Sequence, residues 1–239
     1  MNAERASELL DDLRAATARL ASSIHGLAPT DLRAPSLLPG WNRSHLLTHL
    51  ARNADGARNL LLSVRSGQSV RMYASSETRA ADIASGADRP GQVILDDAVE
   101  SSGRLILDAD CMAPDLWSRQ ILVGSGSADA HHIEAIRPLE MRIREVEIHH
   151  VDLAAGYSFR DTPETLLGWL LTDTISRLAR ADFHVAEVSG KTDAWIVGNA
   201  TEGIHVRGQV HDLIAWLTGR SGGAALASEE PLPTPPSLG

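Results

Sequence analysis

Two short segments of the sequence contain side chains that could bind a metal ion. They are His45-Leu-Leu-Thr-His49 and Glu145-Val-Glu-Ile-His149. In each segment two potential ligands stand four residues apart, so on a helix they lie on one face, roughly 5–6 Å apart at Cβ. If the two faces meet, imidazole and carboxylate groups could bind zinc and leave a coordination position open for chemistry.

The number of ligands decides whether such a site is catalytic. Four protein ligands would close the zinc shell, whereas three leave room for water or substrate. We therefore expect one of the two histidines, His45 or His49, to lie beside the metal and not on it; the spacing does not say which. Zinc fits better than a di-iron centre because the sequence has no second carboxylate-rich motif.

Other polar residues near the second segment have less direct roles. Glu147 points about 200° around the helix from Glu145, so we expect it to be solvated, and His150 is also off the ligand face. Asp152 could orient the free N–H of a ligating histidine, or it could serve as a surface or capping residue. His131-His132 has no clear partner and is interpreted as part of a polar loop.

Apolar spacing predicts the elements that must position these residues. The four long helices expected cover about residues 3–24, 42–64, 91–109 and 138–155, and helices joined by loops favour a bundle, whose core can host a metal. The connections at 65–90 and 113–135 are expected to be irregular. After Gly156 the pattern changes to a helix (163–180), strand-like runs (184–188, 194–197, 203–207), a short helix (210–218) and a proline-rich tail.

The predicted fold class is therefore α+β. A four-helix bundle at 1–157 precedes a small α/β domain at 158–239. The chain has 239 residues, 43% of them hydrophobic, which is enough for a sizeable core. These boundaries place both metal-binding segments in the bundle.

Composition narrows the class of partner. The net charge of −9 argues against nucleic acid and anionic membranes, both of which need a basic surface. The single cysteine excludes an internal disulfide, as in a reducing cytosol. No apolar run approaches the ~20 residues of a membrane span, and the charged N-terminus lacks a signal core. We expect a cytoplasmic monomer that acts on small molecules, with no nucleic-acid or membrane partner.

Four ordered motifs resemble one known family over nearly the whole chain. They are Gly40-Trp-Asn-Arg-Ser-His-Leu-Leu-Thr-His-Leu-Ala-Arg-Asn-Ala-Asp55, Met72-Tyr-Ala-Ser-Ser-Glu-Thr-Arg79 with Ile83, Met141-Arg-Ile-Arg-Glu-Val-Glu-Ile-His-His-Val-Asp-Leu153, and Ala215-Trp-Leu-Thr-Gly-Arg220. The sequence is similar to the mycothiol-dependent maleylpyruvate isomerase family, which belongs to the DinB-like metal-binding helical bundles.

The resemblance implies a ligand set and a reaction. Zinc would be held by His49, Glu145 and His149, with His45 outside the metal shell. Arg79 and Arg220 would be the catalytic and cofactor-site arginines, binding carboxylates through their guanidinium groups. With Zn²⁺ and mycothiol, the enzyme would convert maleylpyruvate to fumarylpyruvate by thiolate addition, rotation and elimination.

Three alternatives to this isomerase stay open. The same zinc site could serve a mycothiol S-transferase that adds the thiol to another electrophile. A non-catalytic zinc-binding stress-response protein would have a closed metal shell, and a metal-dependent hydrolase would use zinc-bound water. Glu140 and Glu147 stand where the characterised family member carries tryptophans, and residues 123–129 lack its arginine. If those positions line the pocket, the electrophile would differ from maleylpyruvate.

Overall fold

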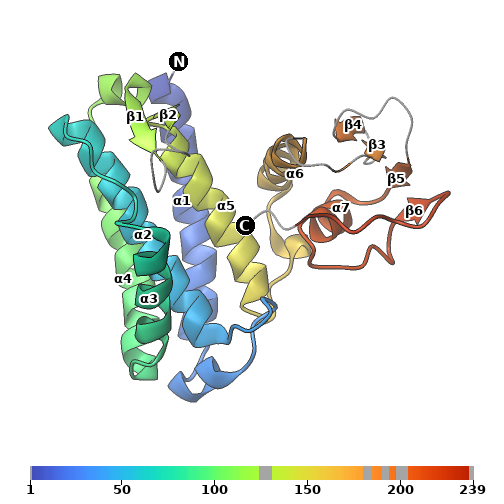
Figure 1. The fold of residues 1–239 in the computed structure, drawn as a ribbon, viewed down its shortest axis with the longest axis horizontal. Helices are drawn as coiled ribbons and strands as arrows, with labels where there is room; N and C mark the ends of the chain where they lie inside the picture. Colours follow the sequence, from blue (N-terminus) through green and yellow to red (C-terminus); the bar gives the residue numbers. More distant parts are fainter. Residues whose placement is uncertain are drawn as a thin grey trace. The chain divides into compact units, whose positions relative to one another are not determined.

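The first unit of the chain is a bundle of four long helices with a shorter helix against it (Figure 1). The structure, a computed structural model, describes residues 2–123, 131–179, 183, 185–189, 194–197 and 204–236. It divides into two units, Met1–Gly156 and Tyr157–Gly239. The helices of the first unit are α1 (Asn2–His25), α2 (Arg43–Ser66), α3 (Ser76–Ala87), α4 (Gly91–Asp110) and α5 (Arg137–Asp152), with 3₁₀ turns η1 (Pro29–Arg33) and η2 (Pro114–Ser118).

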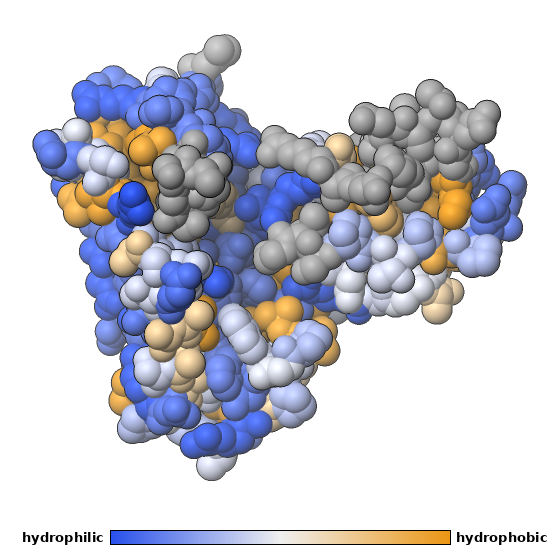
Figure 2. Space-filling view, in the orientation of Figure 1, coloured by the Kyte–Doolittle hydropathy of each residue, from blue (hydrophilic) through white to orange (hydrophobic). Residues whose placement is uncertain are grey.

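The four long helices enclose an aliphatic core. α2 packs against α4 and α5, α1 packs against the same two helices, and α3 lies along α2. The visible surface of this unit is largely hydrophilic, with scattered apolar patches (Figure 2). Burying one leucine side chain stabilises the fold by about 1.5–3 kcal/mol, so the leucine spacing accounts for the bundle. Its most buried leucines include Leu9, Leu13, Leu20, Leu46, Leu47, Leu50, Leu60 and Leu61.

Helix α2 carries the first metal-binding segment and has clear ends. The side chain of Asn42 accepts a hydrogen bond from the backbone N–H of His45 (3.1 Å), which satisfies one of the free donors of the first turn. At the other end Gly67 adopts φ +68°, and its N–H donates to Ser63. A left-handed residue there favours glycine. The helix limits predicted from sequence are confirmed to within a few residues.

Helix α3 corrects the expectation that residues 65–90 are irregular. Its N-cap is Ser75, whose hydroxyl accepts from the N–H of Thr78 (3.1 Å). The helix buries only Ile83 and Ala87, so its apolar pattern is too sparse to show in the sequence. It lies close to α2 at Gly86, where a Cβ atom would come 2.5 Å from Cγ2 of Thr48.

The chain between α2 and α3 also packs closely on α2. A Cβ atom on Gly56 would lie 2.8 Å from Cγ of Met72 and 3.1 Å from Cε1 of Tyr73. The Asn59 side chain donates to the carbonyl oxygen of Met72 (3.3 Å). Glycine at position 56 therefore allows Tyr73 to approach the helix that carries His49.

A short antiparallel ladder corrects the expectation that residues 113–135 are irregular. Strand β1 (Gln120–Val123) pairs with β2 (His131–Glu134), with Ile121 opposite Ile133. His131 and His132, expected in a polar loop, lie in β2 with exposed side chains. Residues 124–130 lie outside the described residues. They include most of the 123–129 stretch, which lacks the arginine of the characterised family member.

The second unit combines helices with a four-stranded sheet, as the α+β class requires. Helices α6 (Glu164–Leu178) and α7 (Val210–Leu217) follow the turn η3 (Phe159–Asp161), and the strands are β3 (Val185–Ser189), β4 (Ala194–Val197), β5 (His205–Arg207) and β6 (Ala227–Ser228). The strand order is β4-β3-β5-β6, with β3 and β5 parallel. Trp216 is buried, and its indole N–H donates to Pro233 of the proline-rich tail (3.3 Å).

Within the described part of the chain, no helix combines the length and apolarity that crossing a membrane requires.

Candidate metal centre

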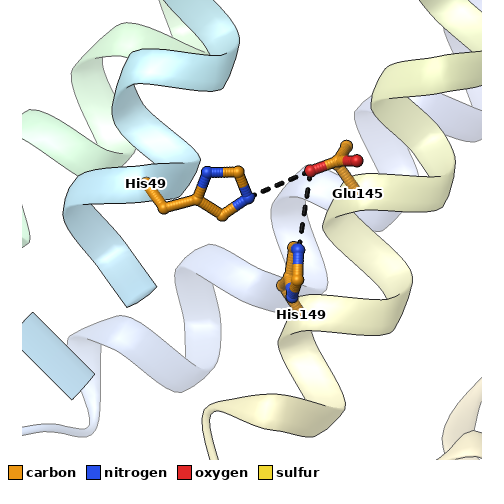
Figure 3. A group of neighbouring side chains, drawn as sticks. All are labelled: His49, Glu145 and His149. Atoms are coloured by element: carbon orange, nitrogen blue, oxygen red, sulfur yellow. Dashed lines mark hydrogen bonds and ion pairs between the residues drawn. The ribbon is translucent and has the colours of Figure 1, made fainter. Parts of the chain in front are cut away.

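Three side chains from two helices meet inside the bundle (Figure 3). His49 projects from α2, and Glu145 and His149 project from α5. Oε2 of Glu145 lies 3.1 Å from Nε2 of His49 and 3.5 Å from Nε2 of His149. One potential ligand atom from each residue lies within 4.8 Å of the others, a grouping of three that the described residues show only here. The structure therefore brings together the three residues that the family resemblance selects.

The two imidazole rings are set almost at right angles. Their centroids are 4.8 Å apart with an interplanar angle of 86°. His49 is only 3% exposed, and the ring of Trp41 lies edge-on to it at 5.6 Å. Both rings are therefore fixed by packing, with one edge directed toward Glu145.

The second nitrogen of each ring also has a partner, and the two partners differ. Nδ1 of His149 lies 2.8 Å from Oδ2 of the fully buried Asp152. In the neutral imidazole the carboxylate therefore fixes the proton on Nδ1, and the lone pair lies on Nε2. Of the two roles open to Asp152, the structure shows the orienting one. Nδ1 of His49 instead accepts a hydrogen bond from Nη2 of Arg79 (3.1 Å).

The protonation of the three groups follows from burial and these contacts. Burial lowers the pKa of His49, and this effect is larger than the opposite effect of the hydrogen bond with Glu145, which raises the pKa. Burial would raise the pKa of Glu145, but hydrogen bonds from His149 and His49 hold it well below its usual range. Burial alone would lower the pKa of His149, yet Asp152 and Glu145 raise it. The two carboxylates thus favour a positive charge at His149, which either a proton or a metal ion on Nε2 could supply.

His45 lies beside this group and not in it. Its Nδ1 is 2.7 Å from Oδ1 of Asn42, and its ring is stacked on Trp41 with centroids 6.3 Å apart. His150, expected off the ligand face, is buried with Nε2 2.8 Å from Oγ of Ser23 on α1.

The expectation that Glu147 is solvated is wrong. Its side chain is 0% exposed and forms an ion pair with Arg19 of α1 at 2.6 Å. The helical rotation does turn Glu147 away from Glu145, but that face of α5 packs against α1 and not against solvent. Glu140 is also largely buried and pairs with Arg137. At both positions that depart from the family pattern, the carboxylate is paired with an arginine of the bundle.

The two predicted arginines belong to different units. Arg79 lies in α3 and touches the metal-binding group through His49. Arg220 follows α7 in the second unit, where its guanidinium donates to the carbonyl oxygen of Thr218. The role of Arg220 in binding carboxylates stays a prediction.

The sequence pattern does not predict a role for Arg142, although this residue stands within the third family motif. It is 1% exposed and donates to the carbonyl oxygen of Leu50 (2.9 Å), Oδ1 of Asn53 (2.8 Å) and Oγ of Ser102 (3.0 Å). Burial lowers the pKa of Arg142 to about 10, so it remains a cation at neutral pH. Its position one helical turn before Glu145 was the available signal.

Residues 13–154, most of the first unit, match a known protein family. A sequence model described as the mycothiol maleylpyruvate isomerase N-terminal domain matches residues 13–154. The chain belongs to this family. The family match spans α2, α3 and α5, and therefore His49, Arg79, Glu145 and His149. A comparison with curated proteins finds no match.

Two solved structures resemble the chain over almost its full length. One is a crystal structure of the mycothiol-dependent maleylpyruvate isomerase, with a TM-score of 0.89 and 27% sequence identity, covering 97% of this chain and 96% of the other. The second is a histidine-to-alanine mutant of that isomerase, with a TM-score of 0.88, 26% identity and the same coverage. These neighbours are an enzyme, so the resemblance supports an enzymatic role and a small thiol partner.

Proposed function

We propose that this protein is a zinc- and mycothiol-dependent cis–trans isomerase that converts maleylpyruvate to fumarylpyruvate. The observation that supports it most directly is the convergence of His49, Glu145 and His149, with Arg79 in contact with one of them. A guanidinium, which can bind an anion, thus lies next to a group able to hold a metal. The family membership and the two structural neighbours support the choice of mycothiol and maleylpyruvate.

The donor set fits zinc. Two imidazole nitrogens and one carboxylate are typical of catalytic zinc, which keeps a fourth position for an exogenous ligand. We infer that His49, Glu145 and His149 would hold it. When bound, zinc would supply the Lewis acidity that keeps a thiol deprotonated at neutral pH. His149 is prepared for this role because Asp152 already occupies its other nitrogen.

His49 requires one rearrangement. A neutral imidazole that accepts from Arg79 at Nδ1 carries its proton on Nε2. If His49 held a metal through Nε2, its proton would lie on Nδ1, which could then no longer accept from Arg79. The guanidinium would be free of His49 and available to a carboxylate of the substrate.

The residues of the chain have distinct tasks in the proposed reaction. Addition of the thiolate to the cis double bond converts it to a single bond and moves an electron pair onto the carbonyl oxygen. Rotation and expulsion of the same thiolate give the trans product and restore the thiol. Arg79, with Arg220 as a second candidate, would bind the carboxylates and stabilise the enolate charge.

The test is to incubate zinc-loaded protein with maleylpyruvate and a catalytic amount of mycothiol. We expect complete loss of the maleylpyruvate absorbance while the thiol remains free at the end. Consumption of one thiol per electrophile would identify an S-transferase instead. Absence of any reaction with both thiol and zinc present would contradict the proposal.

Asp152 provides a separate prediction about the metal. Changing Asp152→Asn keeps the size of the side chain but removes the charge that orients His149. Loss of such an outer partner typically weakens metal affinity 10–100-fold, and we expect about this loss here. Competition with a chromophoric zinc chelator measures it. Asp96→Asn on α4, where the carboxylate pairs with Gln92, is the control and should leave zinc affinity unchanged.

A further inference from the structure

Tyr73 links the metal centre to the buried core of the bundle. The guanidinium carbon of Arg79 lies 5.5 Å from the centroid of the Tyr73 ring. Asn53 of α2 is a neighbour of the same phenol. Tyr73 therefore lies between the buried pair of Arg142 and Asn53 and the pair of Arg79 and His49 at the metal centre.

The position of Tyr73 is set by the helix that carries His49. Asn53 lies four residues after His49 and Gly56 lies seven residues after it, so all three share one face of α2. Gly56 leaves the space that the Tyr73 ring occupies. Arg142 in turn donates to Asn53 and so orients its amide. The phenol is therefore held in place relative to the metal-binding residues from two directions.

The contact between Tyr73 and Arg79 is made by the aromatic ring. A guanidinium over the face of a ring is attracted by the negative potential of that face, within about 6 Å of the ring centroid. The 5.5 Å separation satisfies this limit. A contact through the ring face leaves the N–H groups at the edge of the guanidinium able to donate to a ligand.

We propose that Tyr73 is a positioning residue for Arg79, holding the guanidinium beside the metal-binding atoms so that it can bind a carboxylate of the substrate. The proposal rests on the function proposed above, in which Arg79 is the carboxylate-binding group. A metal held by His49 would remove one of the two contacts of Arg79 described here, the hydrogen bond to Nδ1 of His49. The contact with Tyr73 is the one that persists, because it does not involve a metal-binding residue.

The experiment compares binding of maleate to the zinc-loaded wild type and to a Tyr73→Leu variant by titration calorimetry. Leucine keeps an apolar side chain against Gly56 and removes the aromatic face. We expect maleate to bind roughly 2- to 30-fold more weakly, the effect of losing one contact between a cation and an aromatic ring. Zinc affinity should be unchanged. Tyr73→Phe keeps the aromatic face, so it is the matched control and should bind maleate like the wild type.

Three results would overturn the proposal. The first is equal maleate affinity in wild type and Tyr73→Leu, and the second is no maleate binding to the wild type. The third is loss of zinc together with maleate, which would make Tyr73 a structural part of the metal centre. The measurement needs no turnover. A protein that fails to convert maleylpyruvate, but whose maleate affinity depends on Tyr73, would therefore contradict only the proposed function.

Discussion

Replacing His49 by alanine should abolish zinc binding and isomerase activity together. The variant leaves one imidazole and one carboxylate, too few to hold the ion against solvent. Loss of a partner outside the metal shell already costs 10–100-fold in affinity, so we expect loss of a ligand to cost more than about a hundredfold. Zinc content after dialysis and the rate of maleylpyruvate loss, measured on one preparation, check this.

The chain contains its own control for this prediction. His45 has the same side chain on the same helix, one turn earlier, but its contacts are with Asn42 and Trp41. His45→Ala should keep stoichiometric zinc. If purified His49→Ala retains turnover, or if His45→Ala loses the metal instead, then the assignment of the three ligands is wrong.

Replacing Arg79 by methionine should lower kcat/KM by a factor on the order of 10²–10³, the usual effect of removing a group that stabilises developing negative charge. Zinc content should not change, because Arg79 contacts His49 only at the nitrogen that faces away from Glu145. Arg79→Lys should recover part of the loss, because an ammonium keeps the charge but not the two parallel donors of a guanidinium. Steady-state kinetics at saturating zinc and thiol measure both variants.

Arg71→Met removes the same charge from the same connecting segment at an exposed position. Its kcat/KM should stay near that of the wild type. Equal losses in Arg71→Met and Arg79→Met would show that overall charge, and not the placement of Arg79, determines substrate binding.

The metal-binding group could be predicted largely from sequence because helical geometry is local. Spacing of four residues is enough to place His45 with His49 and Glu145 with His149 on shared faces. Selecting three ligands from four required the family resemblance. The structure adds the reason, since His45 is directed to the residue that caps its own helix.

The errors and omissions concern contacts between distant parts of the chain. The rotation of Glu147 away from Glu145 was inferred correctly, but a helical period does not show whether the opposite face meets solvent or another helix. Helix α3 buries too few apolar residues to produce a pattern. The approach of Tyr73 depends on a missing side chain at Gly56, which no local pattern in residues 65–75 reveals.

The close contacts at Gly56 and Gly86 bear on how this fold can diverge. The metal-binding residues lie on α2 and α5, whereas Tyr73 and Arg79 lie on the segment that joins α2 to α4. That segment is fitted to α2 at two glycine contacts, Gly56 before α3 and Gly86 near its end. In the proposed function, substitutions between these two points would change the contacts of the substrate without altering a residue that would hold the metal. Substrate specificity could then change while metal binding is kept, because different segments of the chain carry the two.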